Sequence, residues 1–211
     1  MTAIEMRDEF LTRYDAATSL AAPGWTEDEI STFLNIAQLR LTEELYHSGN
    51  FTLLSNLIQT DFIVASQSSF IPNGYIVGVD AIFPEFLYYI GSRTKLTRTN
   101  PEVTDEYIPN EMLSDIRTAW KYYTSPFNKV YLKYPKCYMD YGEATQTLVV
   151  LVDYYTSDVS AVELTAVVKP ISIDIGTSTG TNMDLATHNT IVNYAVEEAI
   201  KSIKVAKISN Q

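Results

Sequence analysis

The stretch WTEDEISTFLNIAQLRLTEELYHSG, residues 25–49, predicts a long amphipathic helix that sets the fold class. Thr26 and Glu29 form a capping box, in which the threonine hydroxyl accepts a backbone N–H of the first turn and the carboxylate reaches back to the cap. Apolar residues then recur at helical spacing, and Gly49 stands where a C′ glycine ends a helix. We therefore expect a helix over residues 27–46.

Two further helices are expected near the ends of the chain. A second capping box and apolar residues at helical spacing predict a helix over residues 3–18. The last helix is expected over residues 184–206, where apolar residues again recur along one side. Trp25 precedes the cap of the central helix, and we expect it to pack on Ile30 as a hydrophobic staple.

The middle of the chain favours β-structure. Short apolar or alternating runs, separated by turn residues, predict strands at 62–65, 75–79, 86–96, 130–134 (with a possible continuation through 138), 145–153 and 161–168, and short helices at 53–58 and 111–122. The expected fold is α+β: a small helical bundle from residues 1–50 and 184–211, with an inserted, mainly antiparallel β-sheet region at 51–183. We expect one continuous domain over residues 1–211.

Charge and composition narrow the classes of function. The chain carries a formal net charge of −11, with a pI near 4.6. Sequence-independent binding of nucleic acid needs a basic face, so it is disfavoured, as is binding to an anionic membrane. No run of eighteen apolar residues and no signal-peptide pattern at residues 1–10 occurs, so we expect no membrane association. The single cysteine, Cys137, cannot form an intrachain disulfide.

The sequence DIGTSTG, residues 174–180, is the sharpest candidate for chemistry. It resembles the phosphate-binding hairpin of the actin and sugar-kinase superfamily, where an Asp holds a metal-bound water and the turn donates N–H groups to phosphates. That fold needs a second phosphate loop and an adenosine pocket, for which the remaining residues leave no room. We therefore expect a Gly/Ser/Thr turn, and keep a nucleotide-binding enzyme acting through Asp174 as a remote alternative.

Metal and nucleophile sites are poorly supported. A zinc site would need His47, His188 and Cys137 from distant elements, together with a carboxylate. His47 is expected in the last turn of its helix, His188 at the start of the last helix or in a subunit contact, and Cys137 in a buried, inert position. The sequence therefore predicts no catalytic residue, no cofactor and no metal.

A small basic run stands out against the acidic background. Arg93, Lys95 and Arg98 follow a stretch, residues 41–92, that contains no Lys or Arg but includes Glu43 and Glu44. The run is more often one exposed face of a strand than a phosphate site. In an assembling protein it could meet the acidic helix of a neighbour. These five residues are the candidate subunit interface.

Three groups of residues carry a resemblance to a known family. They are F-x-x-x-Y-D (10–15), A-P-G-W (22–25) and E-I-S-x-F-L-N-x-A-Q (29–38); K-Y-P (133–135), VVLVD (149–153), L-T (164–165) and K-P (169–170); and H-N-x-I-V-x-x-A-V-x-x-A (188–199). In this order they resemble ring proteins of crAss-like phages, which are head–tail connector subunits of short-tailed phages. Residues 60–110 match nothing in that family.

The resemblance implies a structural virion protein without catalytic residues. It implies a ring of twelve copies in the collar or tail, between the portal protein and neighbouring tail or ring proteins, with genomic DNA passing through the channel without specific binding. The acidic composition agrees, because repulsion keeps DNA from sticking to a channel wall. The alternative is another phage tail or baseplate scaffold protein.

Overall fold

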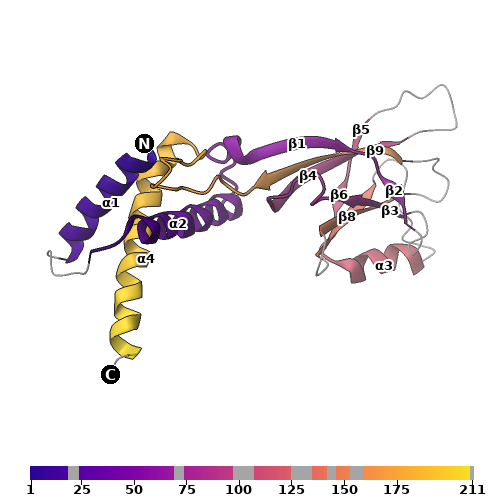
Figure 1. Cartoon of the computed structure of the whole chain (residues 1–211). Helices are drawn as coiled ribbons and strands as arrows, with labels where there is room; N and C mark the ends of the chain where they lie inside the picture. Colours follow the sequence, from indigo (N-terminus) through magenta and orange to yellow (C-terminus); the bar gives the residue numbers. More distant parts are fainter. Residues whose placement is uncertain are drawn as a thin grey trace. The chain divides into compact units, whose positions relative to one another are not determined.

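The chain folds into two compact units. The computed structural model describes residues 1–18, 24–68, 74–96, 107–124, 135–141, 146–152 and 159–209. A helical unit comprises residues 1–57 and 169–211, and a sheet unit comprises residues 58–168 (Figure 1). The predicted α+β class is confirmed, because helices at both ends of the chain flank an inserted region with two mainly antiparallel sheets. The insertion is shorter than expected, since residues 51–57 and 169–183 belong to the helical unit.

Helices α1 (Ala3–Thr18), α2 (Glu27–His47) and α4 (His188–Ser209) make up most of the helical unit, with short 3₁₀-helical turns η1 (Ser55–Leu57) and η2 (Leu185–Thr187). Helix α4 packs against both α1 and α2. Each helix buries one apolar stripe, as expected for a helix with one face in a core. The almost fully buried side chains include Met6, Phe10, Ile30, Leu34, Ala37, Ile191, Val192, Ala195 and Ala199.

Local capping explains where the first two helices begin and end. Both predicted capping boxes are present: Thr2 pairs reciprocally with Glu5, and Thr26 with Glu29. Helix α1 has the predicted bounds, and α2 ends one residue later than predicted. Gly49 follows the C-cap of α2 with a φ of +72°, a conformation that glycine adopts without strain.

The last helix starts later than the sequence predicts. A helix was expected over residues 184–206, but residues at its start form the 3₁₀ turn η2 and α4 begins at His188. The carboxylate of Asp184 accepts the backbone N–H of Ala186 at 2.8 Å, which caps η2 rather than the α-helix. Helix α4 then continues to Ser209.

Two sheets form the inserted unit. The four-stranded sheet has the order β1-β9-β4-β5, and its neighbouring strands are antiparallel. The five-stranded sheet has the order β2-β3-β8-β7-β6, antiparallel except for the pair β6 and β7. The strands are β1 (Ile58–Ile63), β2 (Ser66–Gln67), β3 (Gly74–Gly78), β4 (Phe86–Leu96), β5 (Tyr107–Pro109), β6 (Glu111–Met112), β7 (Lys136–Tyr141), β8 (Gln146–Leu151) and β9 (Val159–Val168).

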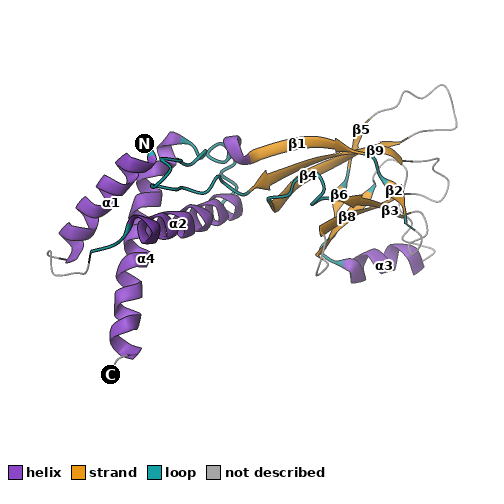
Figure 2. Ribbon diagram, viewed as in Figure 1, coloured by secondary structure: helices purple, strands orange, loops and turns teal. Residues whose placement is uncertain are grey.

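The sheets pack face to face around a shared apolar core. Alternate residues of the central strands point inward, such as Leu164 of β9 and Val150 of β8. The residues between them point outward. On the five-stranded sheet, outward-facing Val149 packs against Ala119 of helix α3 (Ile116–Thr124), which covers that face (Figure 2).

Several predicted elements of the insertion are displaced. The helix expected at residues 111–122 is wrong in its first part, because those residues form β6 and pair with β7; α3 begins only at Ile116. The strand expected at 62–65 lies earlier, at β1, and the helix expected at 53–58 is the 3₁₀ turn η1. Strand β4 has its predicted bounds. The strand expected at 130–134 lies outside the described residues.

Candidate subunit interface

Arg93, the first residue of the basic run, takes part in an ion pair within the chain. It lies on β4 directly opposite Glu163 of β9. Its Nε and Nη2 atoms donate to the Glu163 carboxylate at distances of 2.6 to 2.8 Å. The side chain of Glu163 is 11% exposed, whereas that of Arg93 is 52% exposed. The guanidinium therefore neutralises a nearly buried carboxylate and still faces solvent.

Two aromatic side chains flank this ion pair. Glu163 of β9 is paired with Arg93 on one neighbouring strand and with Phe62 on the other, β1. The ring of Phe62 contacts the ring of Tyr107 on β5, with centroids 5.7 Å apart. The guanidinium carbon of Arg93 lies 5.9 Å from the centroid of the Tyr107 ring. Directly paired residues of neighbouring strands share one face of a sheet, so these side chains all lie on the outer face of the four-stranded sheet.

Lys95 shares this outer face. It follows Arg93 by two positions on β4 and is the cross-strand partner of Tyr107. Arg98 lies outside the described residues. Phe62 and Tyr107 were not among the candidates from the sequence, because the strand pairing that brings Phe62 beside Glu163 was not predicted and no strand was expected at residues 107–109.

The acidic residues of the candidate interface lie at the end of α2 and differ from each other. Glu44 is engaged within the helical unit: it accepts the hydroxyl of Tyr194 at 2.6 Å and an N–H of Arg40 at 3.3 Å. The hydrogen bond to Glu44 raises the pKa of the Tyr194 hydroxyl. The side chain of Glu43 is 60% exposed, and its carboxylate lies 4.0 Å from Nε2 of His47. Glu43 is therefore the more available of the two carboxylates.

The Asp174 hairpin satisfies its own carboxylate. Asp174 accepts the hydroxyl of Thr177 at 2.8 Å and the backbone N–H of Thr177 at 3.3 Å. The bond from the Thr177 hydroxyl lowers the pKa of Asp174. Backbone bonds between Asp174 and Thr179 close the turn, and Ser178 has a φ of 58°. A phosphate-binding loop would direct such N–H groups toward its ligand, whereas here the Thr177 N–H faces the carboxylate.

The three candidate zinc ligands have separate structural surroundings. The imidazole of His188 is buried, with Nδ1 2.9 Å from the backbone nitrogen of Met1 and Nε2 3.2 Å from the carbonyl oxygen of Met183. Cys137 is buried on β7, and burial raises the pKa of its thiol. His47 is exposed at the end of α2, as predicted. Among the described residues, no group of three or more His, Cys, Asp or Glu could hold a metal ion.

The aromatic residues of the motif at 10–38 pack together in the helical unit. Phe10 stacks on Tyr14 and on Phe33, with centroids 5.8 and 6.3 Å apart. The Trp25 ring meets Tyr14 and Phe33 edge-on, at 6.0 and 5.0 Å. These ring contacts of Trp25 join the end of α1 to the start of α2.

Polar side chains of the same motif hold the extended segment 171–175 against α2. They recur at helical spacing, so they lie on one face. The bonds are Asn35 Nδ2 to Ile173 O (2.9 Å), Ile173 N to Asn35 Oδ1 (2.8 Å), Gln38 Nε2 to Ile171 O (3.1 Å) and Ile175 N to Ser31 Oγ (3.2 Å). The segment follows β9 and leads toward α4, so these bonds fasten the returning chain to the bundle.

No protein-family model matches the sequence, and a search of curated proteins gives no significant match. In the part of the chain that the structure describes, no helix combines the length and apolar character needed to cross a bilayer.

Proposed function

We propose that this chain is a structural virion protein that forms a ring in the collar or tail of a short-tailed phage, between portal and tail, like the ring proteins of crAss-like phages. The observation that carries the proposal is the motif at residues 29–38. Its polar residues Ser31, Asn35 and Gln38 fasten the returning segment to α2. The resemblance therefore falls on residues that define the architecture of the helical unit, as a shared fold would require.

The distribution of charged residues supports assembly. Head-to-tail contacts between identical subunits need two different, complementary surfaces, and they close into a ring when the rotation allows. The outer face of the four-stranded sheet carries Arg93 and Lys95, whereas the end of α2 carries Glu43 and Glu44. The two sets have opposite charge and belong to different units, so one copy could offer each set to a different neighbour.

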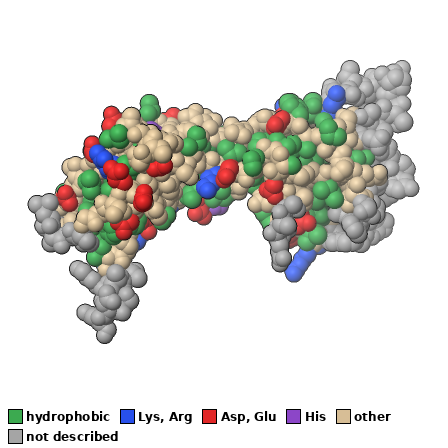
Figure 3. All heavy atoms as spheres, in the orientation of Figure 1, with side chains coloured by type: hydrophobic (Ala, Val, Ile, Leu, Met, Phe, Trp, Pro, Cys, Tyr) green, Lys and Arg blue, Asp and Glu red, His purple; other side chains and the backbone are tan. Residues whose placement is uncertain are grey.

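The overall acidity suits a protein that lines or surrounds a DNA channel. The formal net charge is −11, and acidic side chains are spread over the visible face of the helical unit (Figure 3). Repulsion of phosphates lets DNA pass without sticking. The proposal assigns the chain no enzymatic activity and no cofactor, and it places the protein in the virion, next to the portal and to neighbouring tail or ring proteins.

Electron microscopy of the purified protein tests this function. The protein alone and the protein mixed with the portal of the same virus would be imaged in negative stain and sized by light scattering, with the portal alone as the control. We expect closed rings, of twelve copies where the portal acts as template. A strict monomer in both settings, absent from purified particles, would overturn the proposal.

Two other outcomes separate the alternatives. Binding to tail or baseplate proteins without any complex with the portal would favour a different tail scaffold. A rise in melting temperature with ATP and magnesium that disappears in Asp174→Ala would favour the nucleotide-binding enzyme. The hairpin geometry argues against that second outcome, because the hydroxyl and the backbone N–H of Thr177 both donate to Asp174 and are not directed toward a ligand.

A further inference from the structure

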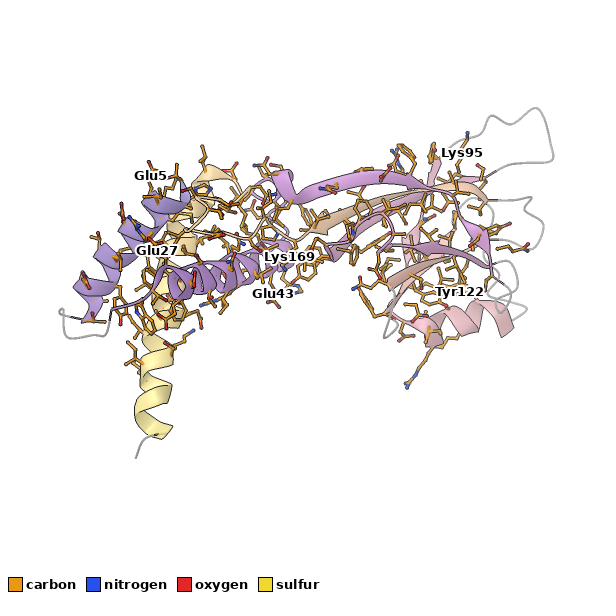
Figure 4. All side chains as sticks on the ribbon, in the orientation of Figure 1. Glu5, Glu27, Glu43, Lys95, Tyr122 and Lys169 are labelled. Atoms are coloured by element: carbon orange, nitrogen blue, oxygen red, sulfur yellow. The ribbon has the colours of Figure 1, made fainter. Side chains whose placement is uncertain are left out.

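The two sheets of the inserted unit differ in how their outer faces are covered. Helix α3 packs on the outer face of the five-stranded sheet, and its Tyr122 packs against the small apolar cluster between them, which includes Ala119 and Val149. Within the described part of the sheet unit, no helix packs on the outer face of the four-stranded sheet. Figure 4 shows Lys95 on that face, directed away from the five-stranded sheet. We define the aromatic face as Phe62, Arg93, Lys95 and Tyr107.

The aromatic rings of this face meet across the sheet. Phe62 belongs to one edge strand and Tyr107 to the other, with β9 and β4 between them. Neighbouring strands lie about 4.8 Å apart, so the two backbones are separated by about 14 Å. Ring centroids only 5.7 Å apart therefore require both side chains to lean inward, across the Arg93–Glu163 pair. Phe62 nevertheless remains 57% exposed.

This composition is that of a protein-binding hot spot rather than of a solvated sheet face. Aromatic residues and arginine dominate the energetics of protein interfaces, and they do so where their surroundings exclude water. The Nε and Nη2 atoms of Arg93 donate to the Glu163 carboxylate, while its Nη1 makes no hydrogen bond within the described residues. The guanidinium is thus held rigidly in place and keeps donors for a second carboxylate.

The edge of the sheet beside this face is protected against strand addition. The carboxylate of Asp61 accepts the backbone N–H of Phe62 at 2.7 Å, which occupies a donor that an added strand would need. Asp61 is itself exposed on the edge strand β1. A partner is therefore expected to cover the face, not to extend the sheet.

We propose that the aromatic face docks onto a second copy of this chain, on an acidic helix surface that includes Glu43. This inference rests on the proposed ring function and names the surface that a ring would use. Charge complementarity supports the choice of occupant: the face carries Arg93 and Lys95, whereas the chain as a whole has a net charge of −11. The side chain of Glu43 is 60% exposed, so its carboxylate is open to contact by another copy.

Removal of the exposed ring tests the docking face. Phe62→Ser is compared with Tyr141→Ser, which deletes another exposed ring, 65% exposed, from the five-stranded sheet. We expect Phe62→Ser to weaken self-association, alone or on the portal, by at least about tenfold, because hot-spot truncations cost more than about 1.4 kcal/mol. Tyr141→Ser should assemble like the parent protein. Equal melting temperatures of the two variants would show that folding is not the cause.

A cysteine reporter tests the same face without removing a ring. Thr60→Cys places a thiol on the outer face of β1, and Gln67→Cys places one on β2 of the other sheet. Native Cys137 is buried. We expect assembly to slow maleimide labelling at position 60 at least tenfold and to leave position 67 unchanged.

The outcomes distinguish this inference from the proposed function. Rings that form normally with Phe62→Ser, or that leave position 60 as reactive as in the monomer, would overturn the docking face while the ring function stands. Protection that requires the portal and occurs without contact between copies would assign the face to the portal and overturn the choice of occupant. Absence of any assembly would overturn both proposals.

Discussion

The side-chain amide of Asn35 takes the place of a neighbouring strand for Ile173. It donates to the carbonyl and accepts from the N–H of the same residue, as a backbone would in a sheet. Ile173 is 1% exposed, so water cannot replace these bonds. One helical side chain thereby satisfies a buried extended residue 138 positions away.

We expect Asn35→Ala to lower the free energy of unfolding by about 2 kcal/mol or more, because it leaves a buried N–H and a buried C=O without partners, each costing about 1–3 kcal/mol. Thr32→Ala on the exposed side of the same helix is the control, since its hydroxyl only bonds the carbonyl of Asp28. Urea titration of both variants measures the difference. Equal stabilities would mean that segment 171–175 is held by other contacts.

The sequence singles out the residues of this network as part of a motif, but it does not show which residues they bond. Asn35 and Gln38 belong to the motif at 29–38, yet nothing local identifies residues 171–175 as their partners. The same holds for Arg93, which lies on the exposed face of a strand as expected, but whose partner Glu163, 70 positions away, was not predicted. Cross-strand register sets that pair, and register depends on contacts that a local pattern does not encode.

At the scale of the element, the start of α2 is fixed by its capping box. The Thr26 hydroxyl accepts the N–H of Glu29 at 3.3 Å, and the Glu29 carboxylate accepts the N–H of Thr26 at 2.9 Å. We expect Thr26→Ala to cost about 0.5–2 kcal/mol of stability, the usual effect of losing such a cap, and Thr26→Ser to cost little. Urea unfolding of the pair measures the effect. A neutral Thr26→Ala would mean that packing of Trp25 alone positions the helix start.

Elements bounded by capping or turn residues could be predicted from the sequence. Elements that form by pairing with a distant segment could not. Capping boxes gave α1 and α2 to within one residue, and turn residues gave β4. Residues 111–112 instead pair with β7, whose nearest residue is more than twenty positions away, so their helical pattern is overridden. Helix α3 begins at Ile116, directly after Asp115, whose carboxylate accepts the backbone N–H of Thr118 at 2.7 Å.

The uneven distribution of charge along the chain allows a direct test of the proposed contact between copies. Lys95 is the better position for charge reversal, because a carboxylate at position 93 would face the nearly buried Glu163. We expect Lys95→Glu and Glu43→Lys each to weaken self-association severalfold, and the double variant to recover most of the loss. An exposed pair contributes only about 0.2–1 kcal/mol, but a ring repeats it at every contact.

Light scattering at low and high salt measures this effect. The single variants should differ from the parent protein most at about 0.1 M salt, and less at about 1 M, where the Debye length falls to about 3 Å. Asp140→Lys, an exposed charge change on β7, is the control for altered net charge. A double variant no better than the singles would mean that Lys95 and Glu43 do not meet in the assembly.

The pairing of β1 with β9 has a consequence for how such a chain can change over time. Ile58, the first residue of the inserted unit, lies opposite Val167, next to its last residue. The chain thus enters and leaves the inserted unit at neighbouring positions. Domains whose two ends lie close together tolerate insertion into another protein. A lineage could exchange the whole sheet unit as a cassette while α1, α2 and α4 keep their connections. The helical unit would then preserve a recognisable ancestry, while the exchanged unit would differ between lineages.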